Sequence, residues 1–338
     1  MAGIGSSVKT LLDWGKEINL DGSIGLVAEV LSQKNDIIPD VMFQEGNSPN
    51  GELVEIRTGL PTSYFRLTNQ GVPTSKATSA QVMETCAELT ARSQVDRAIA
   101  DRSKSPKEYR AKESRAFMES MAQKFATTWF YGSASNPEEI VGLANRYSST
   151  SANNGQNIIS AGGSGSDNTS IWLVDNSEDG VYGVFPMGSS AGLQHEDLGI
   201  QDAFDASNNR FRAYMDMFTW NFGLVVKDWR HAVRIPNIDV SDLKAQSTTQ
   251  AASASTAIMK LMAQAPDRVP DPSAPGLRWY MNRTCASILR VAALEKSNAA
   301  VTVEESLNQF GKTIFQLKFL GIPVKIVDKL TNAESVVS

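Results

Sequence analysis

The segment Gly188–Gly192 is the first candidate for chemistry, because its sequence Gly-Ser-Ser-Ala-Gly matches the G-x-S-x-G motif of serine hydrolases. In that motif a strand precedes the serine and a helix follows it, so that the hydroxyl is exposed at a sharp turn. A strand fits Val181–Phe185, but the residues after Gly192 make a poor apolar helix, and only His231 lies far enough downstream to act as the base. We interpret the segment as a Ser/Gly loop. A cytosolic serine hydrolase using Ser190 stays open as an alternative.

Metal chemistry fails on spacing in the next stretch of the chain. His195-Glu196 begins like the zinc motif H-E-x-x-H, but Gly199 stands where the second histidine is required. The carboxylates of this stretch could attract a cation, although a solvated loop is the better interpretation. They are Glu196, Asp197, Asp202 and Asp205. The sequence therefore predicts no catalytic residue, no cofactor and no metal site.

Composition limits the class of protein. The chain has 338 residues, of which 41% are apolar, enough for one large or two ordinary domains with a sizeable core. A net charge of −5 is poorly suited to binding nucleic acid. Cys86 and Cys285 form no CxxC pair, so neither a zinc site nor a disulfide framework is expected. Residues 1–10 lack the pattern of a signal peptide, and no apolar run reaches the ~20 residues needed to cross a bilayer. We expect a soluble protein made in the cytosol.

The clearest structural signal is a long helix over residues 105–132. Ser105 is a suitable N-cap, Pro106 suits the first helical position and Glu108 completes a capping box. Gly132 is placed to end the helix. An apolar stripe runs along it at Phe117, Met121, Phe125 and Trp129, with Met118 beside it.

The start of this helix is basic. Positive residues alternate there with Glu108 and Glu113, which predicts a solvated face with ion pairs along the helix. The positive residues are Lys104, Lys107, Arg110, Lys112 and Arg115.

Residues 46–80 predict an extended β-hairpin loop. Turn-forming residues crowd Gly46–Gly51, a strand fits Leu53–Thr58, and a second strand fits Tyr64–Leu67 after the break at Gly59-Leu60-Pro61. A two-stranded arm is marginally stable by itself, so it is expected to dock on a partner.

The remainder predicts a mixed α+β fold without internal repeats. Residues 148–170 are a surface loop rich in Ser, Asn and Gly. Helices are expected at 248–264 and 283–294. Strands are expected at 171–174, 181–185, 277–281, 313–319 and 322–327, and at 214–226 paired with 232–238.

Two runs of residues carry a resemblance to a known family. One is Phe319–Asp328 with its Gly-Ile-Pro-Val sequence; the other begins at Met217 and continues through Asp228-Trp229-Arg230 to Asp239. With the order of parts along the chain, they resemble the major capsid proteins of tailed bacteriophages, in particular the epsilon-fifteen-like short-tailed group. The resemblance implies the Hong Kong 97-type fold, and it leaves open a strand order permuted relative to the parent, since little sequence follows the Gly-x-Pro-Val strand.

The resemblance also implies a domain organisation. Residues 1–45 would be an N-terminal arm and 46–80 the extended loop. Residues 81–137 would form the peripheral domain with its spine helix, and 138–338 mostly the axial domain, with some strands returning to the peripheral domain. The extended loop would lie over a neighbour's spine helix. The assembly interface expected on this basis comprises Leu53, Ile56, Arg57, Tyr64, Phe65, Arg66, Arg110 and Arg115.

The implied function is structural. The chain would assemble with itself into pentamers and hexamers of an icosahedral head that encloses double-stranded DNA without sequence-specific binding. Its other partners would be a scaffolding protein, a portal and a cementing or decoration protein. It would be a late protein, assembled in the cytoplasm of the host bacterium and located in the virion, with no membrane contact. An encapsulin-like nanocompartment shell is an alternative with the same fold.

Overall fold

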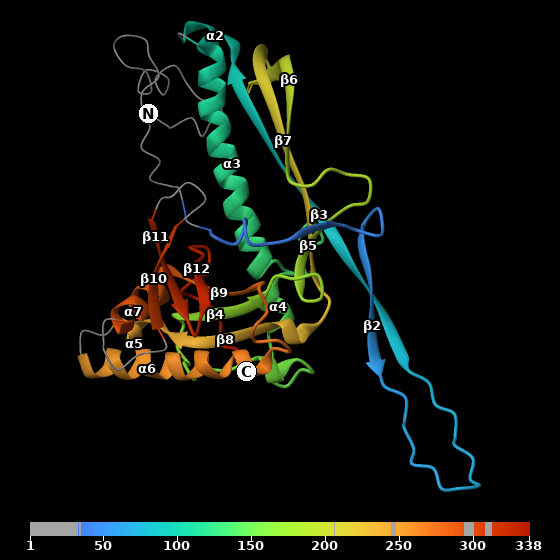
Figure 1. The fold of residues 1–338 in the computed structure, drawn as a ribbon. Coiled ribbons are helices and arrows are strands. Elements are labelled where there is room, and N and C mark those ends of the chain that lie inside the picture. Colours follow the sequence, from blue (N-terminus) through green and yellow to red (C-terminus); the bar gives the residue numbers. More distant parts are fainter. Residues whose placement is uncertain are drawn as a thin grey trace. The chain divides into compact units, whose positions relative to one another are not determined.

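The computed structural model describes residues 33, 35–103, 105–205, 207–244, 248–293, 301–307 and 313–338. The described chain divides into two compact units (Figure 1). Unit 1 holds residue 33, 88–125 and 192–221, and unit 2 holds 35–87, 126–191 and 222–338. The apolar stretches 11–14 and 24–31 of the predicted N-terminal arm, and Lys104, lie outside the described residues.

Unit 1 consists of a long helix and parts of three strands. Helix α3 (Pro106–Tyr131) contributes residues 106–125, and α2 (Arg97–Arg102) precedes it. The strands are β6 (Leu193–Phe204), the first part of β7 (Arg210–Val226) and the second part of β3 (Thr78–Asp96). Strand β7 lies between β6 and β3, and its pairing with β6 is antiparallel.

The apolar stripe predicted on α3 is the face that packs on this sheet. Phe125 stacks on Trp220 with ring centroids 4.6 Å apart, and Phe117 stacks on Phe218 at 6.2 Å. Met121 and Phe125 are fully buried, whereas Met118 beside the stripe is exposed. The four-residue spacing therefore marks the buried side of the helix, as a 3.6-residue period requires.

The predicted ends of α3 are confirmed. Ser105 Oγ accepts a hydrogen bond from the Glu108 N–H at 3.4 Å, and Pro106 is the first helical residue. The helix ends at Tyr131, where the Gly132 N–H donates to the Thr128 carbonyl. A Cβ on Gly132 would lie 2.2 Å from the Ile140 carbonyl oxygen, so glycine is required there by close backbone approach.

Unit 2 contains a six-stranded sheet in the order β10-β11-β12-β9-β4-β8. Strand β12 is parallel to β9, and the other strand pairs are antiparallel. The strands are β4 (Asn168–Asp175), β8 (Ala232–Asp239), β9 (Leu277–Met281), β10 (Val301–Leu307), β11 (Thr313–Phe319) and β12 (Ile322–Ile326). The helices of the unit are α4 (Leu143–Arg146), α5 (Val240–Leu243), α6 (Thr248–Gln264) and α7 (Arg283–Ala293).

Both faces of this sheet are covered at strand β4, where alternate residues serve the two faces. Leu173 and Trp279 belong to the core that α6 and α7 complete with Met262 and Leu289. Trp172, which lies between Ile171 and Leu173, points to the opposite face of the sheet. On that second face Trp172 contacts Phe130, at the end of α3, and Tyr147, each with ring centroids 5.9 Å apart. Continuous burial of β4 follows from this two-sided packing.

The other strands of unit 2 belong to the sheet β1-β5-β7-β3-β2. They are β1 (Phe43–Glu45), β2 (Gly51–Gly59), β5 (Val181–Phe185), residues 222–226 of β7 and residues 78–87 of β3. Three short 3₁₀ turns lie in the connections, at Gly155–Asn157, Trp229–His231 and Pro266–Arg268.

Three sequence predictions about strands are wrong. Tyr64–Leu67 is not a strand, because β2 pairs instead with Thr78–Thr85 of β3 and the intervening 60–77 has no strand partner in the described chain. Residues 193–204 form β6 rather than a solvated loop; the charges that suggested a loop belong to an exposed edge strand. Strands β7 and β8 are consecutive but belong to different sheets, since the turn 227–231 redirects the chain.

Most other predicted elements are confirmed. Strand β5, helix α6, strand β9 and strand β11 have the predicted bounds, and α7 and β12 differ by one residue at one end. Strand β10 was not predicted. The predicted surface loop 148–170 is wrong at its end, because Asn168–Ser170 are buried in β4. Among the described residues, no helix combines the length and apolar character that a membrane crossing requires.

Replacing Gly132 by alanine should destabilise the protein by about 1–3 kcal/mol, because the added methyl group meets backbone oxygens of Ile140 and Thr128 that cannot move independently. Urea unfolding followed by circular dichroism measures the loss. Gly71→Ala is the matched control, since nothing lies within 4 Å of a Cβ there. Equal stability of the two variants would contradict the close-packing argument.

Candidate assembly interface

The hairpin of β2 and β3, with the loop 60–77 that joins them, forms an arm of unit 2 that we call the hairpin arm (Figure 1). Its base is fixed to the rest of the unit. Arg146 makes two parallel bonds to the Glu84 carboxylate, at 2.6 and 2.7 Å, and both side chains are largely buried. The Asn47 side chain exchanges two hydrogen bonds with the backbone of Leu53. Polar contacts thus hold the start of the hairpin rigidly.

An apolar cluster supports the same base. Val54 of β2 packs with Tyr182, Val184 and Val225, and Ile56 lies against them. Beyond this point the hairpin has no core: every residue of 60–83 is exposed. The unit therefore stabilises the first part of the arm and leaves the rest uncovered.

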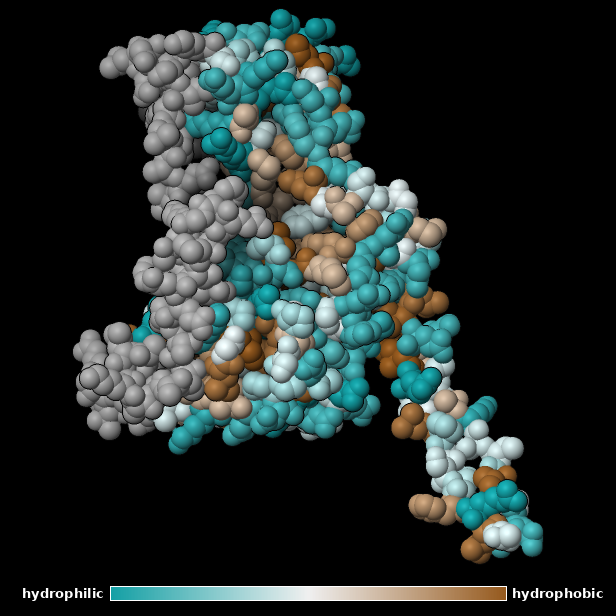
Figure 2. Space-filling model, viewed as in Figure 1, coloured by the Kyte–Doolittle hydropathy of each residue, from teal (hydrophilic) through white to brown (hydrophobic). Residues whose placement is uncertain are grey.

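The loop 60–77 exposes large apolar side chains. Phe65 is completely exposed, Leu60 is 80% exposed and Leu67 is 68% exposed. Tyr64 and Val72 are about half exposed. Figure 2 shows apolar residues along the arm and at its tip. Apolar side chains that the described part of the chain does not cover are typical of a protein–protein contact.

The expected interface residues lie on different elements. Leu53 and Arg57 are exposed on β2, whereas Ile56 is partly buried in the base cluster. Tyr64, Phe65 and Arg66 lie in the loop, where the Arg66 Nε donates to the Gln70 carbonyl at 2.8 Å. Arg115 is exposed on α3. These residues remain predicted contacts, and the exposed loop 60–77 lies at the centre of the predicted interface.

Arg110 has a structural role within unit 1. Its guanidinium group binds Asp216 through Nη2 at 2.7 Å and Nε at 3.3 Å, and Nη2 also binds Asp197 at 2.6 Å. The Asp216 side chain is only 3% exposed, and His195 Nε2 lies 3.0 Å from its Oδ1. The expectation of ion pairs along the helix is wrong for Arg110, because its partners lie on β6 and β7.

Hydrogen bonds keep the Asp197 carboxylate beside Arg110 ionised. The hydrogen bond from Arg110, followed by the backbone N–H of Gly199, holds the pKa of Asp197 below its ordinary value. Asp197 therefore stays ionised opposite the guanidinium group. Neither Asp197 nor Asp216 could be assigned this role from sequence, since only the β6–β7 register brings them to the helix.

A second ion pair is buried in unit 2. Arg234 Nη2 binds Glu334 Oε2 at 2.8 Å, and both side chains are at most 5% exposed. Ser170 and Tyr131 both hydrogen-bond the Glu334 carboxylate. Burial, followed by the charge of Glu334, raises the pKa of Tyr131, which therefore remains a hydrogen-bond donor. This network ties the C-terminal segment and the end of α3 to β4 and β8.

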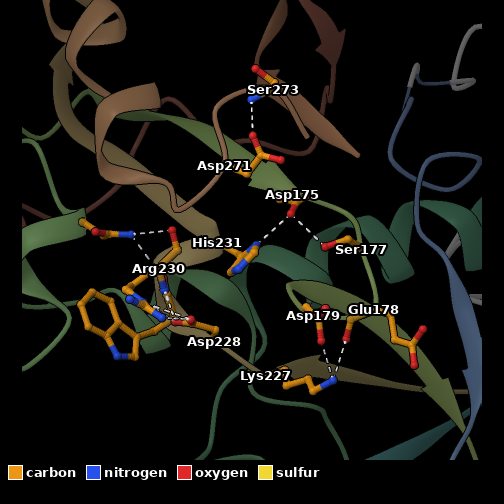
Figure 3. Close-up of polar contacts among 12 residues, drawn as sticks. Asp175, Ser177, Glu178, Asp179, Lys227, Asp228, Arg230, His231, Asp271 and Ser273 are labelled. Atoms are coloured by element: carbon orange, nitrogen blue, oxygen red, sulfur yellow. Dashed lines mark hydrogen bonds and ion pairs between the residues drawn. The ribbon is translucent and has the colours of Figure 1, made fainter. Parts of the chain in front are cut away.

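A polar loop cluster around His231 resembles a catalytic triad only in composition (Figure 3). His231 Nδ1 and Ser177 Oγ each lie 2.8 Å from Asp175 Oδ2. Because the carboxylate stands between serine and histidine, the histidine is not positioned to take the serine proton. Lys227 binds Asp179 nearby at 2.8 Å. The cluster therefore holds the loops together.

The motif around Ser190 lacks the required geometry. Strand β5 precedes it as expected, but strand β6 follows it where a nucleophile elbow needs a helix. In the described parts of the chain, no group of three or more His, Cys, Asp or Glu side chains is arranged to hold a metal ion.

The two thiols are not activated. Burial, followed by the charge of Glu52, raises the pKa of Cys86 to about 11. Burial, followed by the charge of Glu334, raises that of Cys285 to about 12. Both are therefore protonated at neutral pH, whereas a nucleophilic cysteine needs a lowered pKa.

Comparison with known proteins agrees with this architecture. A chain of the bacteriophage epsilon15 structure is 29% identical, with a TM-score of 0.68, over 100% of this chain and 99% of the other. The bacteriophage JBD30 capsid is 9% identical with a TM-score of 0.49, over 97% of each chain. No curated protein matched.

The fold is that of a phage capsid protein of the Hong Kong 97-like type, in agreement with the epsilon15 match. The family model described as major capsid protein GP7 matches residues 19–338. The chain belongs to that family. This result favours the capsid interpretation over the encapsulin-like shell and the Ser190 hydrolase.

Arg110→Ala should lower the free energy of unfolding by about 3 kcal/mol, because it leaves the buried carboxylate of Asp216 without its main partner. Arg110→Lys keeps the charge but loses the two-pronged geometry, so a smaller loss is expected. Chemical denaturation provides the measurement. Arg115→Ala, on the exposed side of the same helix, should change stability by at most ~0.5 kcal/mol. A similar loss at both positions would refute a special role for Arg110.

Thiol-specific labelling at pH 8 should modify Cys86 and Cys285 at least ~10-fold more slowly in the native protein than in urea. The raised pKa of each thiol also predicts the pH dependence of stability. Because the folded state disfavours the thiolate, protonated thiols favour the folded state. This contribution to the free energy of unfolding is complete below the ordinary thiol pKa of ~8.5 and is lost as pH rises toward about 11–12. Cys86→Ser separates the two sites. Fast native labelling would contradict the assigned environments.

Proposed function

We propose that this major capsid protein forms the pentamers and hexamers of an icosahedral head, with the hairpin arm as a principal contact between copies. The observation that carries the proposal is the loop 60–77, which exposes Leu60, Phe65 and Leu67 beyond any core of its own unit. Burying such side chains stabilises an interface by about 25 cal/mol per Å² of apolar surface removed from water. A neighbouring copy is the partner that a closed shell offers at every position.

The domain roles follow from this proposal. Residues 1–45 act as the N-terminal arm and 46–80 as the extended loop. Residues 81–137 act as the peripheral domain, and 138–338 act mostly as the axial domain. The extended loop contacts the peripheral domain of a neighbour, and the function of the chain resides in such interfaces rather than in catalysis. The assembly contacts include Leu53, Ile56, Arg57, Tyr64, Phe65, Arg66, Arg110 and Arg115, of which Arg110 acts by holding β6 and β7 on α3.

The net charge of the chain supports a shell that encloses DNA without binding it tightly. The net charge of −5 disfavours close binding of phosphates, so packaged double-stranded DNA is confined rather than bound to a sequence. Assembly takes place in the cytoplasm of the host bacterium. A scaffolding protein, a portal and a cementing or decoration protein are the further partners that this role implies.

Weak contacts suffice for such a shell. Each copy joins its neighbours through several surfaces at once, so that a modest affinity per contact gives a stable closed assembly. Loss of one repeated contact is then multiplied over the whole shell, which makes assembly a sensitive measure of arm function.

Replacing 60–77 by Asn-Gly between the paired residues Gly59 and Thr78 should give a folded protein that does not form shells. The triple variant Tyr64→Ser, Phe65→Ser, Leu67→Ser should behave in the same way, because it removes the apolar contact alone. Electron microscopy and light scattering measure assembly, and circular dichroism measures folding. Val291→Ser, an exposed apolar residue of α7, is the matched control. Shells of normal yield from both arm variants would disprove the role of the arm.

A further inference from the structure

Residues 331–338 form an extended segment of unit 2 that we call the strap. The strap contains no helix or strand, and a single antiparallel bridge, in which the Glu334 N–H donates to the Asn168 carbonyl at 2.9 Å, joins it to β4. Glu334 and Val337 are buried, whereas five of the eight residues are exposed. The strap is therefore anchored mainly at two points that lie three residues apart.

The rest of unit 2 holds a preformed socket for the first anchor. Arg234 is only 4% exposed, and its guanidinium group is fixed on two sides. Nε donates to Ser170 Oγ at 3.1 Å, and Nη1 donates to the carbonyl groups of Ala144 and Tyr147 at 3.1 and 2.8 Å. The third nitrogen, Nη2, donates to the Glu334 carboxylate. Because groups outside the strap hold the guanidinium in place, the socket offers a fixed positive charge to an entering carboxylate.

The second anchor is a clamp on the backbone of the strap. Asn237 has a φ of +61°, in the left-handed region, where asparagine is more frequent than most other residues with a side chain. Its Oδ1 accepts from the Val337 N–H at 2.9 Å, and its Nδ2 donates to the Val337 carbonyl at 2.8 Å. Nδ2 also donates to Ser160 Oγ at 2.9 Å, which fixes the amide independently of the strap. The clamp thus recognises an extended backbone.

The strap packs incompletely on the rest of the unit. A pocket of about 310 Å³ opens between them, lined by Tyr131, Asn145 and Ser148 on one side and by Ser335 and Val336 on the other. Protein interiors normally leave few spaces of this size. A buried ion pair contributes little net stability, because the desolvation of both charges offsets their attraction. Few contacts therefore oppose release of the strap as a unit.

We propose that the socket is a peptide-binding site, from which the strap is released and which then accepts the strap of a second copy. The ligand class is an extended peptide with a carboxylate side chain three residues before an apolar one. A second copy fits because each contact made within one chain is equally available to the identical segment of another. The exchange needs no icosahedral arrangement and is therefore independent of the proposed function.

Hydrogen exchange on the unassembled wild-type chain tests release of the strap. The backbone amides of Glu334 and Val337 should exchange at similar rates, because one opening event frees both. Both should exchange at least ~10-fold faster than the amides of β9, which has a strand on each side. Strap amides that exchange as slowly as those of β9 would show that the strap leaves only on global unfolding, which would overturn the inference.

Peptide exchange tests the binding site. In the full-length chain, Glu334→Gln removes the carboxylate, so the strap of this variant should dock weakly. The native peptide 331–338, added at ~1 mM, should raise the Tm of the variant by at least ~2 °C. The same peptide carrying Glu334→Gln should have no effect. A peptide carrying Val336→Ser is the matched control, since this side chain is 47% exposed, and it should act like the native peptide.

A variant that does not fold by itself still gives a result. Glu334→Gln is then refolded with each peptide, and circular dichroism should show the folded spectrum only with peptides that keep the carboxylate. No effect of the native peptide, or an equal effect of the peptide without the carboxylate, would show that the socket does not bind a second copy of the strap.

Discussion

A two-stranded hairpin cannot bury its own apolar side chains, and this constraint governs the protein. The outer part of the hairpin arm has a single layer, so Phe65 and Leu67 have no second layer to pack against. They remain in water until another surface covers them. The base of the arm is held differently: Glu84 and Val54 have partners within unit 2. The chain thus presents an exposed tip on a base that is held by its own unit.

Each of the two units also contains a buried charge pair. Arg110 with Asp216 and Arg234 with Glu334 join elements far apart in the sequence, and each carboxylate is also bonded by other side chains. Such pairs contribute little net stability compared with apolar packing, but breaking one leaves an uncompensated buried charge. They therefore fix how helix and strands align. Each pair lies within one compact unit, so each unit keeps its own internal geometry.

Three groups of residues that suggest chemistry lack catalytic geometry in the described chain. Asp175 separates Ser177 from His231, β6 follows Ser190 where a helix would be needed, and burial keeps both thiols protonated. The polar residues that first suggest chemistry instead join loops or stand at an edge strand. In unit 1 the charges around Glu196 that suggested a loop lie on the exposed strand β6.

Local sequence determined much of this fold. The capping residues and four-residue stripe specified α3, and short apolar runs between turn residues specified β5, β9 and β11, because these signals lie within one element. The extended hairpin was also predicted, but with Tyr64–Leu67 as its second strand where the structure has Thr78–Thr85. Tertiary structure decided the rest. Only pairing with β7 makes Leu193–Phe204 a strand, since its charged sequence favours a loop locally. Only the register of that pairing brings Asp197 and Asp216 to Arg110, and only the separation into two sheets parts β7 from β8. Contacts between residues distant in sequence leave no periodic mark in either segment, which is why these contacts became visible only in the folded chain.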